Sequence, residues 1–159
     1  VALLQLRKST MNFKCQLSCL LIFANIWGCT TSSTHVVTVS LDATRQNAGQ
    51  VANATLANQG KQTGFTFFIS GVPDGTSLPL RLYTFINKGS CRQPGPIAYA
   101  MNDRIDTERM ARARAWTYSR SAHVAMPDLL SDDYSIVVRT TPADGDVEIF
   151  CGDIREAGS

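Results

Sequence analysis

The sequence predicts an all-β domain, built as an antiparallel Greek-key sandwich or barrel. Three observations support this fold class. Seven short runs are rich in β-branched or alternating apolar residues, clusters of Gly, Pro, Asn and Asp separate these runs, and only one stretch is rich in helix formers. Strands joined by turns of this kind favour antiparallel pairing over the crossover helices of an α/β fold.

The expected strands follow one another at short intervals. The first, His35–Leu41, alternates polar and β-branched residues, which is typical of a half-buried strand, and polar residues 45–50 predict a turn after it. The later expected strands are Val51–Ala57, Thr63–Ser70, Leu80–Ile86, Trp116–Val124, Tyr134–Thr140 and Asp146–Cys151. The expected turns between them are Asn58–Gly60, Gly71–Gly75, Lys88–Ser90, Gln93–Pro96 and Thr141–Gly145.

One stretch has helical character. Asp106–Ala115 contains Thr-Glu-Arg-Met-Ala-Arg-Ala-Arg-Ala, which consists mostly of good helix formers. We therefore expect a short helix or an elaborated loop there.

Residues 1–29 have the features of an export signal. Lys14 supplies a basic start, Leu17–Trp27 is an apolar run of eleven residues, and Gly28-Cys29 is a small-residue exit. The run is too short to span a bilayer, and its alternative interpretation is a buried core segment. We expect residues 30–34 to form a polar tether, 35–154 a single β-domain and 155–159 a C-terminal tail.

The end of this signal allows two interpretations. Cys29, preceded by Ile26-Trp27-Gly28, resembles the lipid-accepting cysteine of bacterial lipoproteins, and plain cleavage nearby is the alternative. Residues 1–10 precede Met11 and are either an over-extended reading of the gene or a longer basic region. The prediction is an exported protein, periplasmic or anchored to the outer membrane of a bacterium, whose membrane association depends on a lipid at Cys29.

The cysteines divide between the signal and the body of the chain. Cys15 and Cys19 lie inside the signal and Cys29 at its edge, so that only Cys91 and Cys151 remain in the β-domain. An even pair in an exported domain predicts a disulfide, and two free thiols are the alternative.

The charge balance gives no support to a nucleic-acid partner. Beyond Cys29 the chain has twelve basic and thirteen acidic residues, a formal net charge of −1. A nucleic-acid-binding domain ordinarily carries a strong positive excess.

Four motifs, in this order, resemble the copper-zinc superoxide dismutase family and its metal-less relatives. Gly71–Gly75 looks like the family's Gly-Leu-Pro-Pro-Gly turn, and Thr84–Cys91 looks like its His-x-His-Glu-x-x-x-Cys segment. Asp128–Arg139 looks like its Asp-Leu-Leu and Val-Val-His segment, and Cys151–Ile154 looks like its Cys-Gly-Val-Ile end. The likeness covers about His35–Ile154 and implies a Greek-key β-sandwich.

The same resemblance implies that the family's metal ligands are missing. The two histidines of its strand fall on Thr84 and Ile86, and its late copper-ligand histidine falls on Arg139. Threonine is a poor ligand, isoleucine is none, and arginine is a permanent cation. Beyond the signal only His35 and His123 remain, which are too few for a zinc centre of about four side-chain ligands. We therefore expect no metal, no cofactor and no enzymatic activity.

A copper site of another kind is the alternative. Thioether sulfurs suit Cu(I), and Met101, Met110, Met126 and His123 are the available ligands. Such a site would make the protein a copper carrier or a residual redox enzyme. Core filling is the ordinary explanation of these methionines.

A cluster of arginines suggests a binding site. Its cations are interleaved with aromatic residues, and guanidinium groups with aromatic faces suit a carboxylate, a phosphate, a lipid headgroup or an acidic protein surface. The alternative is a solvated loop paired internally with Asp103, Asp106 and Glu108. The residues of the cluster are Arg104, Arg109, Arg112, Arg114, Arg120, Trp116 and Tyr118.

The function predicted from sequence is a non-catalytic exported module that binds a ligand or supports a structure. Its expected partner is an envelope protein or an anionic ligand contacted through the arginine cluster. The copper-binding alternative and a subunit of a larger envelope assembly are the competing predictions.

Overall fold

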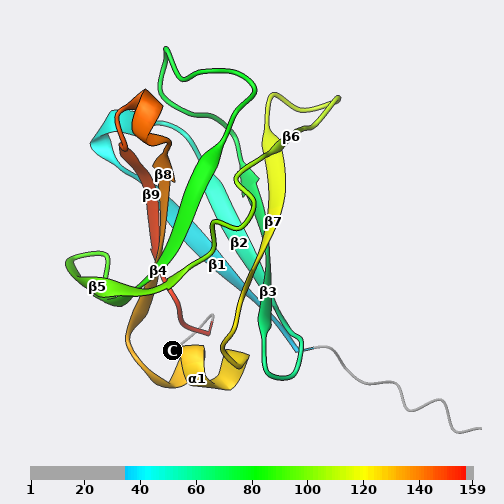
Figure 1. Ribbon diagram of the computed structural model, residues 1–159, viewed down its shortest axis with the longest axis vertical. Helices are drawn as coiled ribbons and strands as arrows, with labels where there is room; N and C mark the ends of the chain where they lie inside the picture. The colour runs from blue at the N-terminus through cyan, green and yellow to red at the C-terminus, as the bar shows by residue number, and fades with distance from the viewer. Residues whose placement is uncertain (1–34, 157–159) are drawn as a thin grey trace, which may run out of the picture. The chain divides into compact units, whose positions relative to one another are not determined.

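The structure, a computed structural model, describes residues 35–156, which form one curled antiparallel sheet with a short helix at one end (Figure 1). The predictions for the export signal, the tether, Cys29 and residues 157–159 lie outside the described residues. None of the described helices is long and apolar enough to cross a membrane.

Nine strands, one α-helix and two 3-10 helices make up the described chain. The strands are β1 (Val36–Ala43), β2 (Ala52–Asn58), β3 (Thr63–Ile69), β4 (Leu82–Ser90), β5 (Gln93–Ala100), β6 (Glu108–Arg109), β7 (Trp116–Ala122), β8 (Tyr134–Thr140) and β9 (Glu148–Asp153). The helices are η1 (Arg45–Asn47), α1 (Met126–Ser131) and η2 (Pro142–Asp144).

The strand order is β5-β4-β8-β9-β1-β2-β3-β7-β6, and every pair is antiparallel. Strands β3 and β4, and strands β7 and β8, are consecutive in the chain but not neighbours in the sheet, so the connections cross between its two halves. The halves meet at β1 and β9 through only two residue pairs, Asp42↔Cys151 and Ala43↔Phe150. The sheet thereby curls into a half-barrel, which confirms the predicted all-β antiparallel fold.

Each of the seven expected strands is present, with ends displaced by a few residues, and β5 and β6 are additional. Lys88–Ser90 was expected to turn but continues β4, and Gln93–Pro96 was expected to be loop but begins β5. The reversal instead falls at residues 91–92. Proline lacks an N–H group and is tolerated in an edge strand, and β5 is the outermost strand of the sheet.

Of the two structures expected at Asp106–Ala115, the elaborated loop is present and the short helix is not. This stretch contains the two-residue strand β6 and a turn, with the Met110 N–H donating to the Ala115 carbonyl at 3.0 Å. A helix there would have no apolar face to bury, since Arg112 and Arg114 are exposed and Met110 is 39% exposed. Short helices without such burial are marginal in water, so pairing with β7 prevails. The observed helix α1 instead buries Met126 and Leu129.

Alternation of side chains places one face of each half-sheet in a shared core. In the first half, rows such as Val39, Ala54 and Phe67 point inward, and β8 and β9 supply Ile136, Val138 and Phe150 from the second half. Burying one large apolar side chain contributes about 1.5–3 kcal/mol. The largest fully buried side chains are Phe65, Phe67, Phe150, Leu56, Ile69, Leu82, Ile86, Met126, Leu129, Ile136, Ile149 and Val138.

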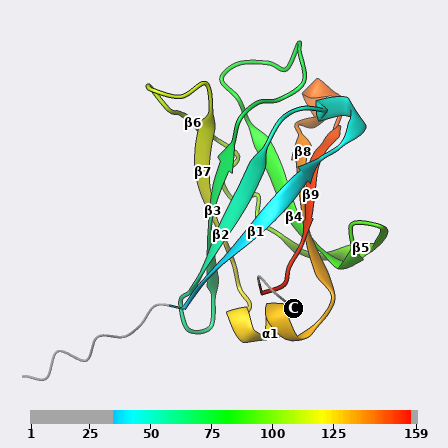
Figure 2. The same cartoon turned by 180° about the vertical axis from the view of Figure 1, so that it is seen from behind.

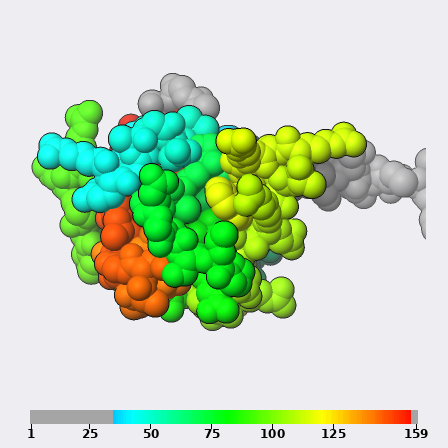
Figure 3. Space-filling view, turned by 90° about the horizontal axis from the view of Figure 1, so that it is seen from above, coloured from blue at the N-terminus to red at the C-terminus, as the bar shows by residue number. Residues whose placement is uncertain are grey.

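One end of the half-barrel is covered by loops, which lie side by side in the view from above (Figure 3). The long connection before β4 meets the β8–β9 turn, where the Ser77 N–H donates to Asp144 Oδ1 at 3.0 Å. Hydrogen bonds from Ser77 and Thr141 lower the pKa of Asp144 below its ordinary value. Loops that are far apart in the sequence therefore meet at this end of the half-barrel, and helix α1 lies at the other end.

Candidate functional site

The inner face of β7 carries a charged residue, Arg120. Along this strand Tyr118, Arg120 and Ala122 point inward, and Arg120 is opposite Phe65 of β3. Arg120 is only 8% exposed. A cation therefore occupies a position that strand alternation assigns to the core.

Arg120 links the two sides of the curled sheet. Its Nη1 donates to the Ser119 carbonyl at 2.8 Å, and its Nη2 reaches the carbonyls of Leu82 at 3.3 Å and Asp106 at 3.5 Å. The guanidinium carbon lies 4.4 Å from the centroid of the Tyr118 ring, a cation–π distance. The side chain thus connects β7 to β4 and to the loop between β5 and β6.

The charge of Arg120 has no carboxylate partner within ion-pair distance in the part of the chain that the structure describes. Asp106 interacts electrostatically with Arg120, but its ion pair is with Arg81, whose Nε lies 3.7 Å from Asp106 Oδ1. Burial lowers the pKa of Arg120, but arginine stays protonated at neutral pH. The Arg120 Nε is buried without a hydrogen-bond partner. Besides carbonyls and a ring, the Arg120 charge has only the electrostatic attraction of Asp106, without an ion pair; a buried cation so balanced is costly, and an anion nearby would stabilise it.

A hollow of about 380 Å³ lies between β7 and the loop at residues 101–106. The residues that line it include two arginines, two serines and one glutamine, against a single carboxylate. An adjoining hollow of about 290 Å³ shares Arg104, Ser119 and Arg120. The residues lining the first hollow are Gln59, Met101, Asp103, Arg104, Ser119, Arg120 and Ser121.

Tyr118 and Thr84 continue this polar region into the core. The Tyr118 hydroxyl lies 3.3 Å from Thr84 Oγ1, and both residues are buried. Burial raises the pKa of Tyr118 above its ordinary value. The phenol is therefore neutral, and the only charge in this part of the core is that of Arg120.

This pKa shift predicts a loss of stability at alkaline pH. The stability that the neutral Tyr118 phenol contributes is complete below about pH 10, where the unfolded chain ionises, and is lost as the pH rises toward the higher pKa of the folded state. We expect Tyr118→Phe to lose less free energy of unfolding than the wild type between about pH 9 and pH 11. Urea denaturation at each pH measures the free energy of unfolding of both proteins. An equal decrease with pH in the wild type and in Tyr118→Phe would contradict the prediction.

The structure brings together only part of the predicted arginine cluster. Arg104, Arg120 and Tyr118 line the adjoining hollows, whereas Arg112 and Arg114 are exposed in the turn between β6 and β7. Arg109 lies over the Trp116 ring at 5.4 Å. Among the described residues, no ion pair joins the cluster to Asp103, Asp106 or Glu108. The exposure of Arg112 and Arg114 agrees with the solvated loop of the alternative, and Asp106 interacts electrostatically with Arg120 without an ion pair.

The positions that the resemblance equates with metal ligands lie on two faces of the sheet. Thr84 and Ile86 point into the core from β4. Arg139 of β8 is opposite Tyr83, so it lies on the other face of the sheet, and its Nε is 3.0 Å from Asp146 Oδ1. Successive side chains of a strand point to opposite faces of the sheet, so positions that the motif comparison placed in one site lie on two faces.

Metal-ligating side chains are also dispersed. Within residues 35–156 there is no group of three or more His, Cys, Asp or Glu side chains suited to a metal ion. His35 Nε2 lies 3.5 Å from Glu156, and His123 is exposed after β7. Met101 and Met126 belong to the core, as ordinary packing predicts, and Met110 lies in the exposed turn.

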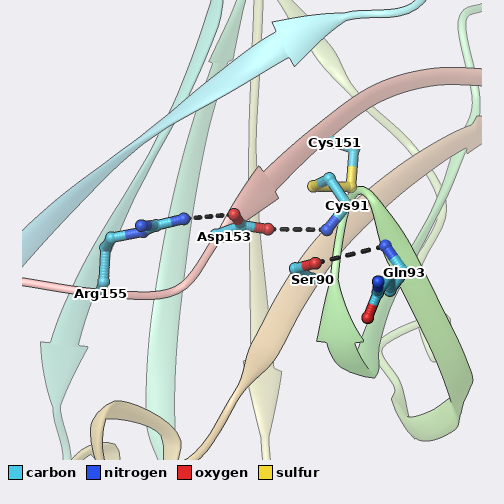
Figure 4. Close-up of a disulfide and its surroundings, with 6 residues drawn as sticks. All are labelled: Ser90, Cys91, Gln93, Cys151, Asp153 and Arg155. Carbon is cyan, nitrogen blue, oxygen red and sulfur yellow. Dashed lines mark hydrogen bonds and ion pairs between the residues drawn. A yellow bond between two sulfur atoms is a disulfide. The ribbon is translucent and has the colours of Figure 1, made fainter.

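The predicted disulfide is confirmed (Figure 4). Cys91, in the β4–β5 turn, is bonded to Cys151 of β9, with 5.9 Å between their Cα atoms. Asp153 Oδ1 accepts the Cys91 N–H at 2.7 Å, and its other oxygen pairs with Arg155. A polar groove of about 690 Å³ lies beside this bond and is bounded on one side by β1.

Sequence reasoning did not identify Gln59, Ser119 and Ser121 as residues of the hollow. The alternation Tyr118-Ser-Arg-Ser-Ala122 contained a usable signal, because it separates the inward Arg120 from the outward serines. Gln59 lies in the β2–β3 turn, and no local pattern indicated its role.

Comparison with known proteins returned no matching family model, no matching curated protein and no matching solved structure.

Proposed function

We propose that this protein is a non-catalytic binding module that holds an anionic group, a carboxylate or a phosphate, in the hollow between β7 and residues 101–106. The observation that carries the proposal is the buried guanidinium of Arg120, which has no carboxylate partner in the described chain. Arg104 is a second cation among the residues that line the hollow. Charge-assisted hydrogen bonds of this kind are the strongest that a protein offers an anion.

The scaffold of this module, in the proposal, is superoxide-dismutase-like without the metal centre, and the protein is exported to the cell envelope. The four ordered motifs and the Cys91–Cys151 disulfide support the scaffold. The basic, apolar and small-residue order of residues 1–29 supports export, with Cys29 as a lipid acceptor. Dispersion of the candidate ligands Thr84, Ile86 and Arg139 supports the absence of a catalytic centre of that family's kind.

Titration with inorganic phosphate and with acetate tests the anion site. We expect saturable binding of at least one of them, seen by calorimetry and by chemical-shift changes of Ser119–Ser121, and weaker binding as salt rises. Arg104→Ala should weaken binding about tenfold or more, since one charge-assisted bond is lost. Arg120→Lys keeps the charge but loses the fork and should weaken binding as well.

Arg114→Ala is the matched control, because Arg114 is an exposed cation of the same segment outside the hollow. Its affinity should equal that of the wild type. Absence of binding of either anion at low salt would overturn the proposal, as would equal losses in Arg104→Ala and Arg114→Ala. Stoichiometric, tight retention of copper would instead favour the copper-carrier alternative.

A further inference from the structure

Strand β7 has a free edge over most of its length. Among the described strands its neighbours are β3 and β6, and β6 is only two residues long. Residues 118–122 of β7 therefore have a strand on one side only, and Figure 2 shows β6 beside one end of β7. The adjoining hollows of about 380 and 290 Å³ lie along this free edge, because Ser119 and Arg120 line both of them.

The two hollows differ in charge. The larger hollow is lined by two arginines, Arg104 and Arg120, and by one carboxylate, that of Asp103. The smaller hollow is lined by the same two arginines and by two carboxylates, those of Asp106 and Glu108. The site thus has an excess of positive charge at one end and charges of both signs at the other.

The opposite charges of the smaller hollow are not joined to one another. Among the described residues, neither Arg104 nor Arg120 forms an ion pair, and Glu108 forms none either. Asp106 attracts Arg120 electrostatically, but its ion pair is with Arg81, and both side chains of that pair are more than half exposed. An exposed pair of this kind contributes little stability, so it leaves the Asp106 carboxylate open to a second cation.

The geometry of β7 keeps these charges apart. Arg120 points inward, so Thr117 and its opposite residue Glu108 lie on the outer face of the sheet. Arg120 is also three residues beyond Thr117, or about 10 Å further along the strand. Both Glu108 and Arg120 nevertheless line the smaller hollow, which therefore extends around the free edge of β7 from one face to the other.

We propose that this site holds a small zwitterion, a molecule with an anionic group and an ammonium group a few bonds apart, such as an α-amino acid or phosphoethanolamine. This inference rests on the proposed anion site and adds the second half of its ligand. The anionic group accepts hydrogen bonds from Arg104 and Arg120, and the ammonium group donates to the carboxylates of Asp106 and Glu108. Ligand pockets in proteins measure about 300–1,000 Å³, so hollows of about 380 and 290 Å³ suit a small molecule better than a polymer.

Calorimetric titration with matched pairs of ligands tests the proposal. Acetate is glycine without its ammonium group, and inorganic phosphate is phosphoethanolamine without its aminoethyl group. We expect at least one zwitterion to bind about tenfold or more tightly than its matched anion, because a further charge-assisted hydrogen bond forms. The glycine and phosphoethanolamine arms distinguish a carboxylate zwitterion from a phosphate zwitterion.

Glu108→Lys should change the two kinds of affinity in opposite directions. The added cation should strengthen the binding of acetate and phosphate, whereas loss of the carboxylate should weaken zwitterion binding about tenfold or more. A misfolded variant would lose both, so opposite changes cannot arise from misfolding. Asp74→Lys is the matched control, because Asp74 is an exposed carboxylate that lines neither hollow, and it should bind every ligand like the wild type.

The outcomes separate this inference from the anion site on which it rests. If each zwitterion bound the wild type no more tightly than its matched anion, the inference would be overturned and the anion site would stand. Equal effects of Glu108→Lys and Asp74→Lys on zwitterion binding would overturn it as well. If neither the anions nor the zwitterions bound, the anion site would fall together with the inference.

Discussion

Replacement of both Cys91 and Cys151 by alanine is expected to lower the free energy of unfolding by about 4 kcal/mol. The disulfide closes a sequence separation of 60 residues, and the loop-entropy relation gives about this value for such a loop. The position of the disulfide in the sheet gives a structural reason for this loss of stability. Cys151 is also the residue that pairs with Asp42 across the short β1–β9 junction, where the half-sheets share two residue pairs.

Urea denaturation of the oxidised wild type, the reduced wild type and the double alanine variant measures this effect. The reduced protein and the variant should agree, since both lack the crosslink. Amide hydrogen exchange should accelerate most in β5 and the β4–β5 turn, because Cys91 holds that turn to β9. A loss below about 1 kcal/mol would mean that the turn is held by its other contacts, chiefly the Cys91 N–H bond to Asp153.

The fold class could be predicted because local chemistry and the global sheet agree. Alternation of small apolar and polar residues in β1 and β2 indicates strands at any position in a fold, and the Cys91–Cys151 pair follows from counting. Strand β5 could not be predicted, because Gln93-Pro-Gly-Pro96 is typical of a turn and pairs only because β4 extends beyond its apolar run. At Asp106–Ala115 the loop prevails over the alternative of a short helix, because helix propensity alone is insufficient without an apolar face to bury.

The candidate site, like the fold, could be predicted from the sequence only in part. The clustering of arginines in the sequence predicted a binding site. It could not show which of them line a hollow, because their contacts depend on segments that are distant in the chain. The Leu82 carbonyl that Arg120 reaches is 38 residues away in the chain. Outward serines and an inward arginine on β7 follow from alternation, whereas the approach of residues 101–106 to that strand depends on tertiary structure.

Phe67→Ala is expected to destabilise the fold by about 3–5 kcal/mol, the cost of removing a fully buried phenylalanine. The Phe67 ring lies 4.6 Å from the Tyr118 ring with 9° between their planes, so an aromatic contact of about 0.5–1.5 kcal/mol is lost together with the buried surface. Thermal and urea denaturation measure the loss. Phe67→Leu, which keeps most of the volume, should cost much less and serves as the control.

The consequence of Phe67→Ala for binding should differ from its consequence for stability. Phe67 supports Tyr118, and Tyr118 in turn lies against the guanidinium of Arg120, which the ring holds at 4.4 Å. Under conditions in which the variant remains folded, phosphate affinity should therefore fall, because the cation is less firmly positioned. If Phe67→Ala retained full phosphate affinity, Arg120 would be positioned by its carbonyl contacts alone, and the stack of rings would belong to the core without a part in the site.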